Sequence, residues 1–234
     1  MRTVIRVLGW IGSHERTTLV ALTLLGLAGW GFAETADFVI DGESRALDER
    51  ILLSMRTTSD PNDPLGPPWV EELARDITSL GGLAFLTLMT LAATGFLLLQ
   101  RKSHLALYLV LVVSTGALAS QSMKSLFDRA RPDLVAHGQA VFSSSFPSGH
   151  SMMSTLVFFT VGALLASALT SRRLKAYVLV LAALLAVIVG ATRVYLGVHW
   201  PTDVLAGWTA GCAWALLCWI LADFLKRRGS VESG

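Results

Sequence analysis

The sequence predicts an all-α fold, an integral membrane six-helix bundle with short external amphipathic helices. Hydrophobic residues make up 53% of the 234-residue chain and charged residues only 15%, whereas soluble domains carry about 25% charged residues. The hydrophobic residues are gathered into six long apolar runs, and about 20 helical residues cross a hydrocarbon core of roughly 30 Å. The length of the chain fits a single membrane-embedded domain over residues 1–234.

The first apolar run covers about residues 18–33 and is at the short end of the range of about 17 to 25 residues that a span needs. A weakly amphipathic stretch with Arg2, Arg6 and Arg16 precedes it, which is typical of a segment on a cytoplasmic surface. The small residues at positions 31–33 also resemble a signal-peptide cleavage site, but the long leader before the run favours a retained helix. Either alternative leaves the topology of the remaining chain unchanged.

Residues 34–79 form the only long polar region, and we expect this segment to be external. Its proline-rich stretch, residues 60–68, excludes regular helix or sheet, because proline fixes φ and removes a donor. On either side, apolar residues recur at helical spacing, within residues 47–55 and 73–77. We therefore expect two short amphipathic helices joined by a loop, which either lie over the membrane surface near a site or form a packed connection.

Five further apolar runs complete the six predicted spans. They cover approximately residues 80–99, 105–123, 152–170, 176–191 and 204–225. With the amino terminus in the cytoplasm, the basic residues of the two short loops and of the carboxyl-terminal tail all fall on the cytoplasmic side, as the positive-inside rule requires. Both termini are then cytoplasmic, and three polar clusters at the ends of spans fall together on the external face.

The first polar cluster, residues 124–132, ends an apolar run. Lys124 and Arg131 are seven residues apart, so they would share a face on a helix that continues through both. Pro132 marks where that helix must stop. Basic residues at the end of a membrane helix are usually anchors that extend to the interface, but an external position favours a functional role for these two.

The second cluster, residues 146–151, directly precedes an apolar run. Ser148 and Gly149 would begin a helix, and the first backbone N–H groups of a helix have no intrahelical partner and form a natural site for an anion. Gly149 permits close approach of a ligand to the backbone. A plain helix cap would explain the serines of this cluster but not His150.

The third cluster, residues 192–203, opens the last apolar run. His199 and Asp203 are four residues apart, with Pro201 between them, which suits the first position of a helix and brings the pair toward one face. A carboxylate that accepts from one ring nitrogen fixes the tautomer and leaves the other nitrogen free to attack. A lone pair of this kind is more often a structural hydrogen bond, but Arg193 nearby makes His199 a better candidate nucleophile.

Together the three clusters resemble the signature of the phosphatidic acid phosphatase type 2 superfamily, which also includes vanadium haloperoxidases and glucose-6-phosphatases. The matching pattern is Lys124-x6-Arg131-Pro132, then Pro147-Ser148-Gly149-His150, then Arg193-x5-His199-x3-Asp203. The six-helix plan extends the resemblance over most of the chain. The one departure is Thr192, where the family pattern commonly has serine, and the hydroxyl is retained.

The resemblance implies a phosphate-binding set. Lys124, Arg131 and Arg193 would hold the phosphoryl oxygens, assisted by backbone amides at Ser148 and Gly149. The residue types agree with this on physical grounds, because phosphoryl transfer depends mainly on positioning and charge stabilisation. Three cations and a helix N-terminus supply both.

The resemblance also implies three catalytic residues. His199 would attack phosphorus and become a phosphohistidine, Asp203 would orient His199, and His150 would protonate the leaving group. We expect no metal or other cofactor, because the histidines and aspartates do not follow a known metal-motif spacing.

The expected function is hydrolysis of a lipid phosphate or pyrophosphate at the external face of a bacterial cytoplasmic (inner) membrane. The candidate substrates are undecaprenyl pyrophosphate, phosphatidylglycerol phosphate and phosphatidic acid, and the first is placed first because an external site suits recycling of that carrier. Two alternatives stay open, a lipid phosphotransferase and a phospholipid transporter, although a transporter would need charges deep in several spans. The net charge of +2 is too small to suggest nucleic acid as a partner, and the sequence leaves the oligomeric state unknown.

Overall fold

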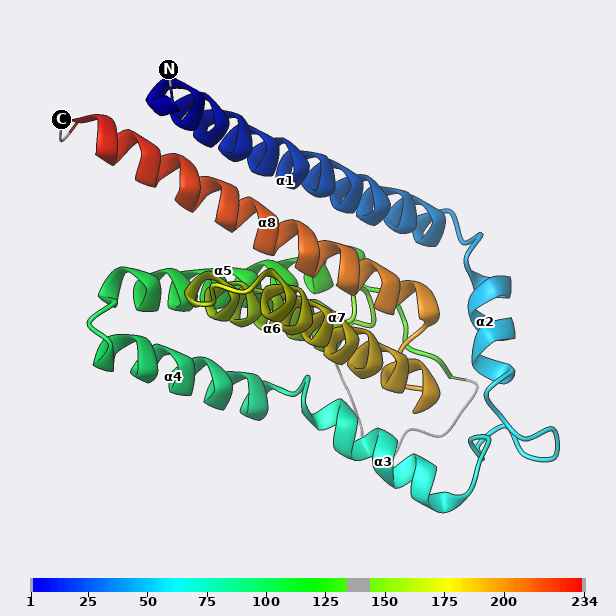
Figure 1. Ribbon diagram of the computed structural model, residues 1–234. Coiled ribbons are helices and arrows are strands. Elements are labelled where there is room, and N and C mark those ends of the chain that lie inside the picture. The colour runs from blue at the N-terminus through cyan, green and yellow to red at the C-terminus, as the bar shows by residue number, and fades with distance from the viewer. Residues whose placement is uncertain (1, 134–143, 233–234) are drawn as a thin grey trace.

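The computed structural model describes residues 2–133 and 144–232, and within these ranges the chain forms eight α-helices (Figure 1). They are α1 (Arg2–Ile40), α2 (Arg45–Leu53), α3 (Pro68–Ser79), α4 (Leu83–Leu99), α5 (Ser103–Phe127), α6 (Gly149–Ala168), α7 (Arg172–Tyr195) and α8 (Pro201–Glu232). The only β-pairing in the described ranges is an isolated bridge between Arg56 and Pro64. The all-α prediction is confirmed.

The length and composition of these helices give six candidate spans. Five are single helices, formed by Arg16–Ile40 of α1, by α5, α6 and α7, and by Pro201–Lys226 of α8. The sixth is α4, which is long and apolar enough only when counted together with α3; the two helices meet at a bend of 46°, as in a broken span or a re-entrant loop. The described helices thus provide five spans, or six when α3 and α4 are counted as one, in agreement with the predicted six-helix plan.

The segment between the first two spans differs in one boundary from the sequence expectation. Residues 34–40, expected outside the first span, continue α1 as regular helix. Packing explains the difference, because Ala36 is buried against Phe146 and Ala206. The two predicted amphipathic helices correspond to α2 and α3.

The bundle is arranged around α6, which packs against α4, α5, α7 and α8. Most side chains of α6 between Ser151 and Val161 are buried. Figure 1 shows α1 on the outside, running antiparallel along α8. The start of α1 and the end of α8 lie at one end of the bundle, and α2 and α3 lie at the other.

Close packing of α8 on α6 depends on two glycines of α8. A Cβ on Gly207 would lie 2.7 Å from the carbonyl oxygen of Ser148, and a Cβ on Gly211 would lie 2.5 Å from that of Met152. Small residues at a spacing of four allow the backbones of membrane helices to approach closely. This contact brings the first turn of α6 against the first turns of α8.

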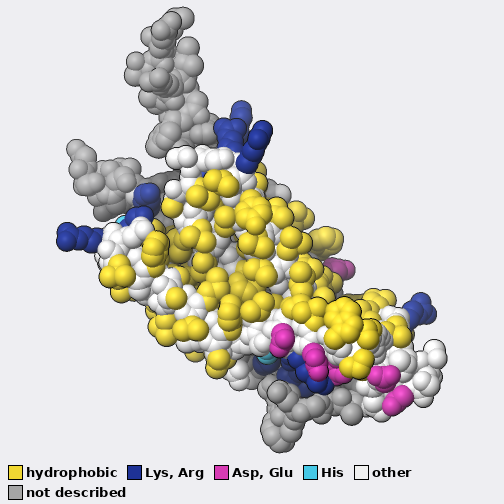
Figure 2. Space-filling model, turned by 60° about the horizontal axis from the view of Figure 1, so that its bottom comes forward, with side chains coloured by type: hydrophobic (Ala, Val, Ile, Leu, Met, Phe, Trp, Pro, Cys, Tyr) yellow, Lys and Arg dark blue, Asp and Glu magenta, His cyan; other side chains and the backbone are white. Residues whose placement is uncertain are grey.

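The outer surface is broadly apolar. Large exposed side chains include Leu88 and Leu91 of α4, Leu107 of α5 and Leu184 of α7. Figure 2 shows hydrophobic side chains over the middle of the molecule, with most of the acidic side chains in that view gathered toward one end. An apolar surface of this extent belongs against lipid rather than water.

Candidate active site

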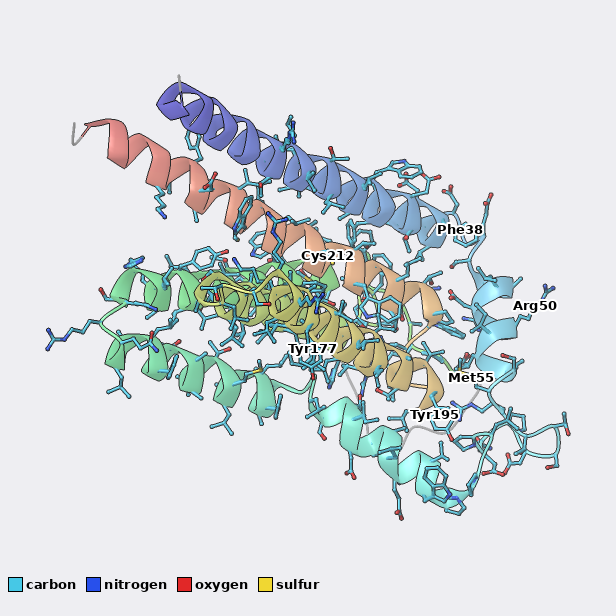
Figure 3. The ribbon with its side chains drawn as sticks, viewed as in Figure 1. Phe38, Arg50, Met55, Tyr177, Tyr195 and Cys212 are labelled. Atoms are coloured by element: carbon cyan, nitrogen blue, oxygen red, sulfur yellow. The ribbon has the colours of Figure 1, made fainter. Side chains whose placement is uncertain are left out.

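The three polar clusters meet at the end of the bundle where α2 and α3 lie. Consecutive spans run in opposite directions (Figure 1), so the end of α5, the start of α6, the end of α7 and the start of α8 share this end. Figure 3 marks it with Tyr195, at the end of α7, and Met55, which follows α2. The two segments are joined by Arg56, which donates to the Tyr195 carbonyl oxygen at 2.8 Å.

His199 lies just before α8, and its ring is buried. Its Nδ1 is 3.4 Å from Asp203 Oδ2 and 3.3 Å from the Ser145 hydroxyl, and its Nε2 is 3.2 Å from Arg131 Nη1. A guanidinium group only donates, so the contact with Arg131 requires an unprotonated Nε2 and places the ring proton on Nδ1. This tautomer directs the Nε2 lone pair toward the side of the site on which Arg131 lies.

The environment of His199 also determines its charge. Burial lowers the pKa of His199 from 6.5 to about 4; the charges of Arg131 and Arg193 act in the same direction, and the hydrogen bond and charge of Asp203 oppose them. The imidazole is therefore neutral near pH 7. The neutral ring is the form that a nucleophile requires.

Asp203 is held in place by several donors besides His199. Its Oδ2 accepts from the Trp200 backbone N–H at 2.9 Å and from the Ser145 hydroxyl. Its Oδ1 accepts from Arg129 Nη1 at 2.5 Å. The carboxylate is fully buried, so its orientation is fixed by these contacts.

Arg129 connects Asp203 to α2. Its Nη2 donates to Asp48 Oδ2 at 2.6 Å and to the Ser44 hydroxyl at 3.0 Å. Asp48 is fully buried and also accepts from the backbone N–H and the hydroxyl of Thr202. One guanidinium group thus bridges two buried carboxylates.

Sequence reasoning missed Arg129, Asp48 and Ser145. Arg129 and Asp48 lie 81 positions apart, so no spacing pattern links them. The available signal was a second arginine two positions before Arg131 in the first cluster.

The first turn of α6 provides an anion site, and Lys124 lies beside it. A Cβ on Gly149 would lie 3.5 Å from Lys124 Nζ, so the ammonium group is next to the helix N-terminus. Ser148 caps the helix, since its hydroxyl accepts from the Ser151 backbone N–H at 3.4 Å. The first backbone N–H groups of a helix have no intrahelical acceptor, so those of Gly149 and His150 add to the positive potential.

Arg193 and His150 complete the set of predicted site residues. Arg193, in the last turn of α7, donates from Nη1 to the Thr78 hydroxyl at 3.1 Å, and its buried Nε has no hydrogen bond to any residue that the structure describes. A Cβ on Gly81 would lie 3.4 Å from His150 Cδ2, so the break between α3 and α4 lies against this ring. His150 is also within electrostatic range of Arg193 and His199.

The structure departs from two details of the sequence expectation. α5 ends at Phe127, and Asp128 adopts a left-handed conformation with φ of 40°, so Arg131 reaches the site from an irregular segment and not from a continuing helix. The Ser148 backbone N–H donates to the Asp203 carbonyl oxygen at 2.9 Å. It therefore holds α6 and α8 together, and the amides next to it are better placed for an anion.

Comparison with known proteins identifies the family. Residues 104–227, which include all three clusters, match the PAP2 superfamily. The chain belongs to the PAP2 superfamily. Its relatives in this superfamily include phosphatidylglycerophosphatase B of Bacillus subtilis (strain 168), 37% identical over 147 residues that cover 62% of this chain and 71% of that protein. They also include a lipid A 1-phosphatase of Rhizobium etli, 32% identical over 176 residues that cover 64% of this chain and 71% of that protein.

A solved PAP2 structure has the same fold. The crystal structure of a transmembrane PAP2 type phosphatidylglycerolphosphate phosphatase from Bacillus subtilis matches with a TM-score of 0.72 and 29% sequence identity. The match covers 88% of this chain and 98% of that one. The chain is thus a multi-pass bacterial membrane protein and a PAP2 hydrolase of phosphate esters or anhydrides of lipids.

Proposed function

We propose that this PAP2 protein hydrolyses a lipid phosphate through a phosphohistidine on His199, at the external face of the cytoplasmic membrane. The observation that carries the proposal is the orientation of the His199 ring. Nδ1 faces Asp203 and Nε2 faces Arg131. A phosphoryl group held by Arg131 would therefore lie on the side of the nitrogen that has a lone pair.

The first step is attack of Nε2 on phosphorus. The N–P bond forms as the bond to the leaving oxygen breaks, and His150 donates a proton to that oxygen. Lys124 and Arg193, with the first-turn amides of α6, stabilise the charge on the phosphoryl oxygens. Asp203 stabilises the positive charge that develops on His199.

The second step releases phosphate. His150, now neutral, accepts a proton from a water molecule as the water oxygen bonds to phosphorus and the N–P bond breaks. His199 returns to its neutral form, and inorganic phosphate leaves. The sum of both steps is the addition of water to one phosphate ester or anhydride bond.

The substrate class follows from the location of the site and from the relatives. The site lies where the spans end, so a phosphate can bind there while its hydrocarbon tail stays in the lipid. Phosphatidylglycerol phosphate becomes the first candidate, ahead of undecaprenyl pyrophosphate and phosphatidic acid, because the similar Bacillus subtilis phosphatase and the similar solved structure are both named for it. The external orientation rests on the basic loops at residues 101–102 and 172–175, which lie at the opposite end of the bundle.

The test is phosphate release in detergent with excess chelator from these three lipids, together with acid-labile phosphate on the protein. We expect release by wild type and none by His199→Ala. His150→Ala should slow release from the lipids, because it no longer protonates the poor leaving oxygen. With an activated aryl phosphate, whose leaving group needs no proton, it should accumulate the phosphoenzyme because its water step is slow. Size-exclusion profiles matching wild type would show that the variants fold. Release by His199→Ala at the wild-type rate would refute the mechanism, and transfer of phosphate to a lipid hydroxyl in place of water would identify a phosphotransferase.

A further inference from the structure

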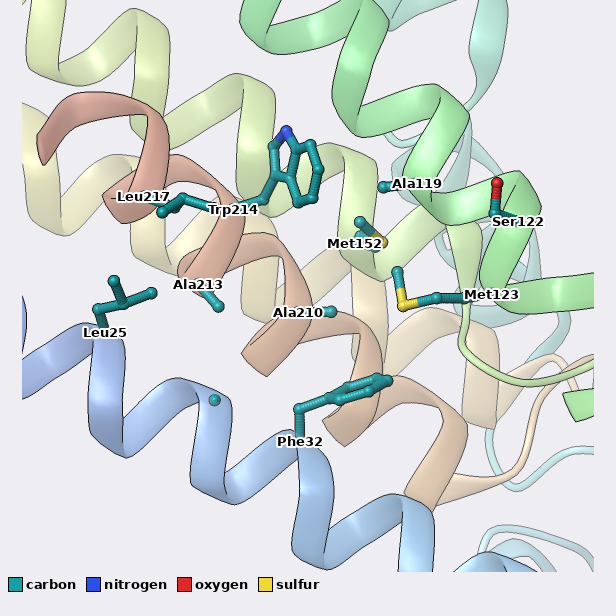
Figure 4. A pocket seen from close by; sticks show the side chains of 11 residues that line it. Leu25, Phe32, Ala119, Ser122, Met123, Met152, Ala210, Ala213, Trp214 and Leu217 are labelled. Carbon is teal, nitrogen blue, oxygen red and sulfur yellow. The ribbon is translucent and has the colours of Figure 1, made fainter. Parts of the chain in front are cut away.

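An apolar cavity of about 370 Å³ lies between α1, α5, α6 and α8 and is open to the outer surface of the bundle (Figure 4). α1 contributes Leu25, Gly29 and Phe32 to its lining, and Trp214 and Leu217 belong to α8. The lining is almost entirely apolar, with Ser122 of α5 as its one hydroxyl side chain. The volume is in the range of about 300 to 1,000 Å³ that small-molecule sites occupy.

The cavity begins close to the candidate phosphate site. Met152 of α6 lines it and lies one turn below Gly149, a distance of about 4.5 Å along the helix at 1.5 Å per residue. On α5, Met123 lines the cavity and is the immediate neighbour of Lys124. Lys124, whose Nζ lies beside Gly149, is thus next to the residues that line one end of the cavity.

The cavity runs from there toward the middle of the membrane. On α8 it extends from Ala210 to Leu217, seven residues or about 10 Å along the helix. On α1 it extends over the same number of residues, from Phe32 to Leu25. A site with cations at its upper end and hydrocarbon along its length is complementary to one amphiphile, a phosphate group carrying a long aliphatic chain.

We propose that this cavity binds one hydrocarbon chain of the lipid phosphate substrate and aligns its phosphate with His199. The inference rests on the proposed function and goes beyond it, since it assigns the tail to the space between α1, α5 and α8. The charge complementarity of Lys124 and the continuity with the first turn of α6 favour the substrate over any other lipid. A bulk membrane lipid in the cavity is the alternative that the experiment must separate.

Gly29 offers a selective way to fill the cavity. It lines the space, and a Cβ added to it would meet no atom within 4 Å, so there is open space for a larger side chain on the α1 side of the cavity. Gly26 on the same helix is the matched control, because a Cβ there also meets nothing within 4 Å and the residue does not line the cavity. The two variants are Gly29→Phe and Gly26→Phe.

The assay compares kcat/KM for dioleoyl and dibutyryl phosphatidylglycerol phosphate. We expect Gly29→Phe to lower the value for the long-chain lipid by about 10- to 100-fold, since a displaced chain misplaces the phosphate relative to His199. The short-chain lipid should be hydrolysed at the wild-type rate, and Gly26→Phe should match wild type on both. An unchanged long-chain rate in Gly29→Phe would overturn the proposal, and so would an equal loss on both lipids, which would place the damage at the phosphate site.

A labelling experiment tests the same site without turnover. A phosphatidic acid with a photoreactive group in its acyl chain should label peptides of α1 and α8 that line the cavity. Unlabelled phosphatidic acid should compete and phosphatidylcholine should not; equal competition by both would assign the cavity to bulk lipid. If wild type released no phosphate from any lipid, the proposed function would fail, whereas loss of the chain preference alone would refute only the cavity assignment.

Discussion

Replacing Arg131 with Gln should move the acidic limb of the pH–rate profile to higher pH. The Arg131 guanidinium lies 3.2 Å from His199 Nε2 and contributes to holding the pKa of His199 at about 4, below its usual 6.5, alongside burial, which is the larger cause. Two charges about 4 Å apart interact by about 1 kcal/mol in water and about 4 kcal/mol at an effective dielectric constant of 20. Arg131 is only partly buried, so the lower part of this range applies, and about 1.4 kcal/mol corresponds to one pH unit.

The sign follows from the charge that is removed. A neighbouring cation disfavours the imidazolium, so its loss raises the pKa of His199, and the neutral nucleophile is lost at a higher pH. We expect the limb of Arg131→Gln to lie about 1 to 2 pH units above that of wild type.

The assay is kcat/KM for one lipid phosphate from about pH 3 to 8, because this ratio reports groups of the free enzyme. Comparing variants on the same substrate removes the ionisation of the substrate from the difference. Arg131→Lys is the control, since it keeps the charge and loses the planar guanidinium; its rate should fall while its limb stays near that of wild type. The assigned tautomer and contact would be refuted if the acidic limb of Arg131→Gln lay at the same pH as that of wild type. They would also be refuted if the limb of Arg131→Lys moved as far as that of Arg131→Gln.

Three further predictions concern the frame of the site. Asp48→Asn should lower the free energy of unfolding by up to about 3 to 5 kcal/mol, because Arg129 would keep a single carboxylate and removing one partner from a buried ion pair costs about this much. A thermal unfolding midpoint in detergent equal to that of wild type would contradict this. Gly207→Ala should cost about 1 to 3 kcal/mol through overpacking and lower kcat, because its Cβ would collide with the backbone carbonyl at the start of α6; unchanged stability and rate would show that the helices separate freely. Thr78→Val should raise KM for a lipid phosphate by about tenfold, because Arg193 would lose its hydroxyl partner and a hydrogen bond to a charged group contributes about 1.5 to 3 kcal/mol. A fall in kcat alone would instead place Thr78 in the chemical step.

Hydropathy located the spans because a membrane requires long apolar helices, but it could not locate their ends. α5 is an example: Lys124 and Arg131 are spaced as on a helix, yet the helix stops four residues before Arg131. A residue before proline is disfavoured in the helical region, and Asp128 tolerates the left-handed conformation that ends the helix. These local signals lie in the sequence, but they compete with the spacing pattern, and spacing alone gave the wrong geometry.

The site residues were recognisable for a different reason. Lys124, Arg131, His150 and His199 stand out because they lie in polar clusters at the predicted external ends of spans, whereas the other basic residues at span ends fall mainly on the cytoplasmic side. Asp48 did not stand out, because it is one of many acids in the polar segment between the first two spans. Its role depends on a tertiary contact, and a single sequence holds no signal for such a contact.

The polar segment between the first two spans is best understood as the frame of the site. Asp48 of α2 fixes Arg129, which fixes Asp203, and Thr78 of α3 contacts Arg193. Two sides of the candidate active site are thus held by residues that precede the family motifs by dozens of positions.

This frame also distinguishes Arg129 from the other cations of the site. Its charge is already balanced by two buried carboxylates, Asp48 and Asp203, so it would add little to the binding free energy of a phosphate. We therefore expect Lys124, Arg131 and Arg193 to supply the attraction for phosphate. Arg129 would act on the rate only through Asp203, so substitutions there should alter kcat and stability more than the affinity for inorganic phosphate.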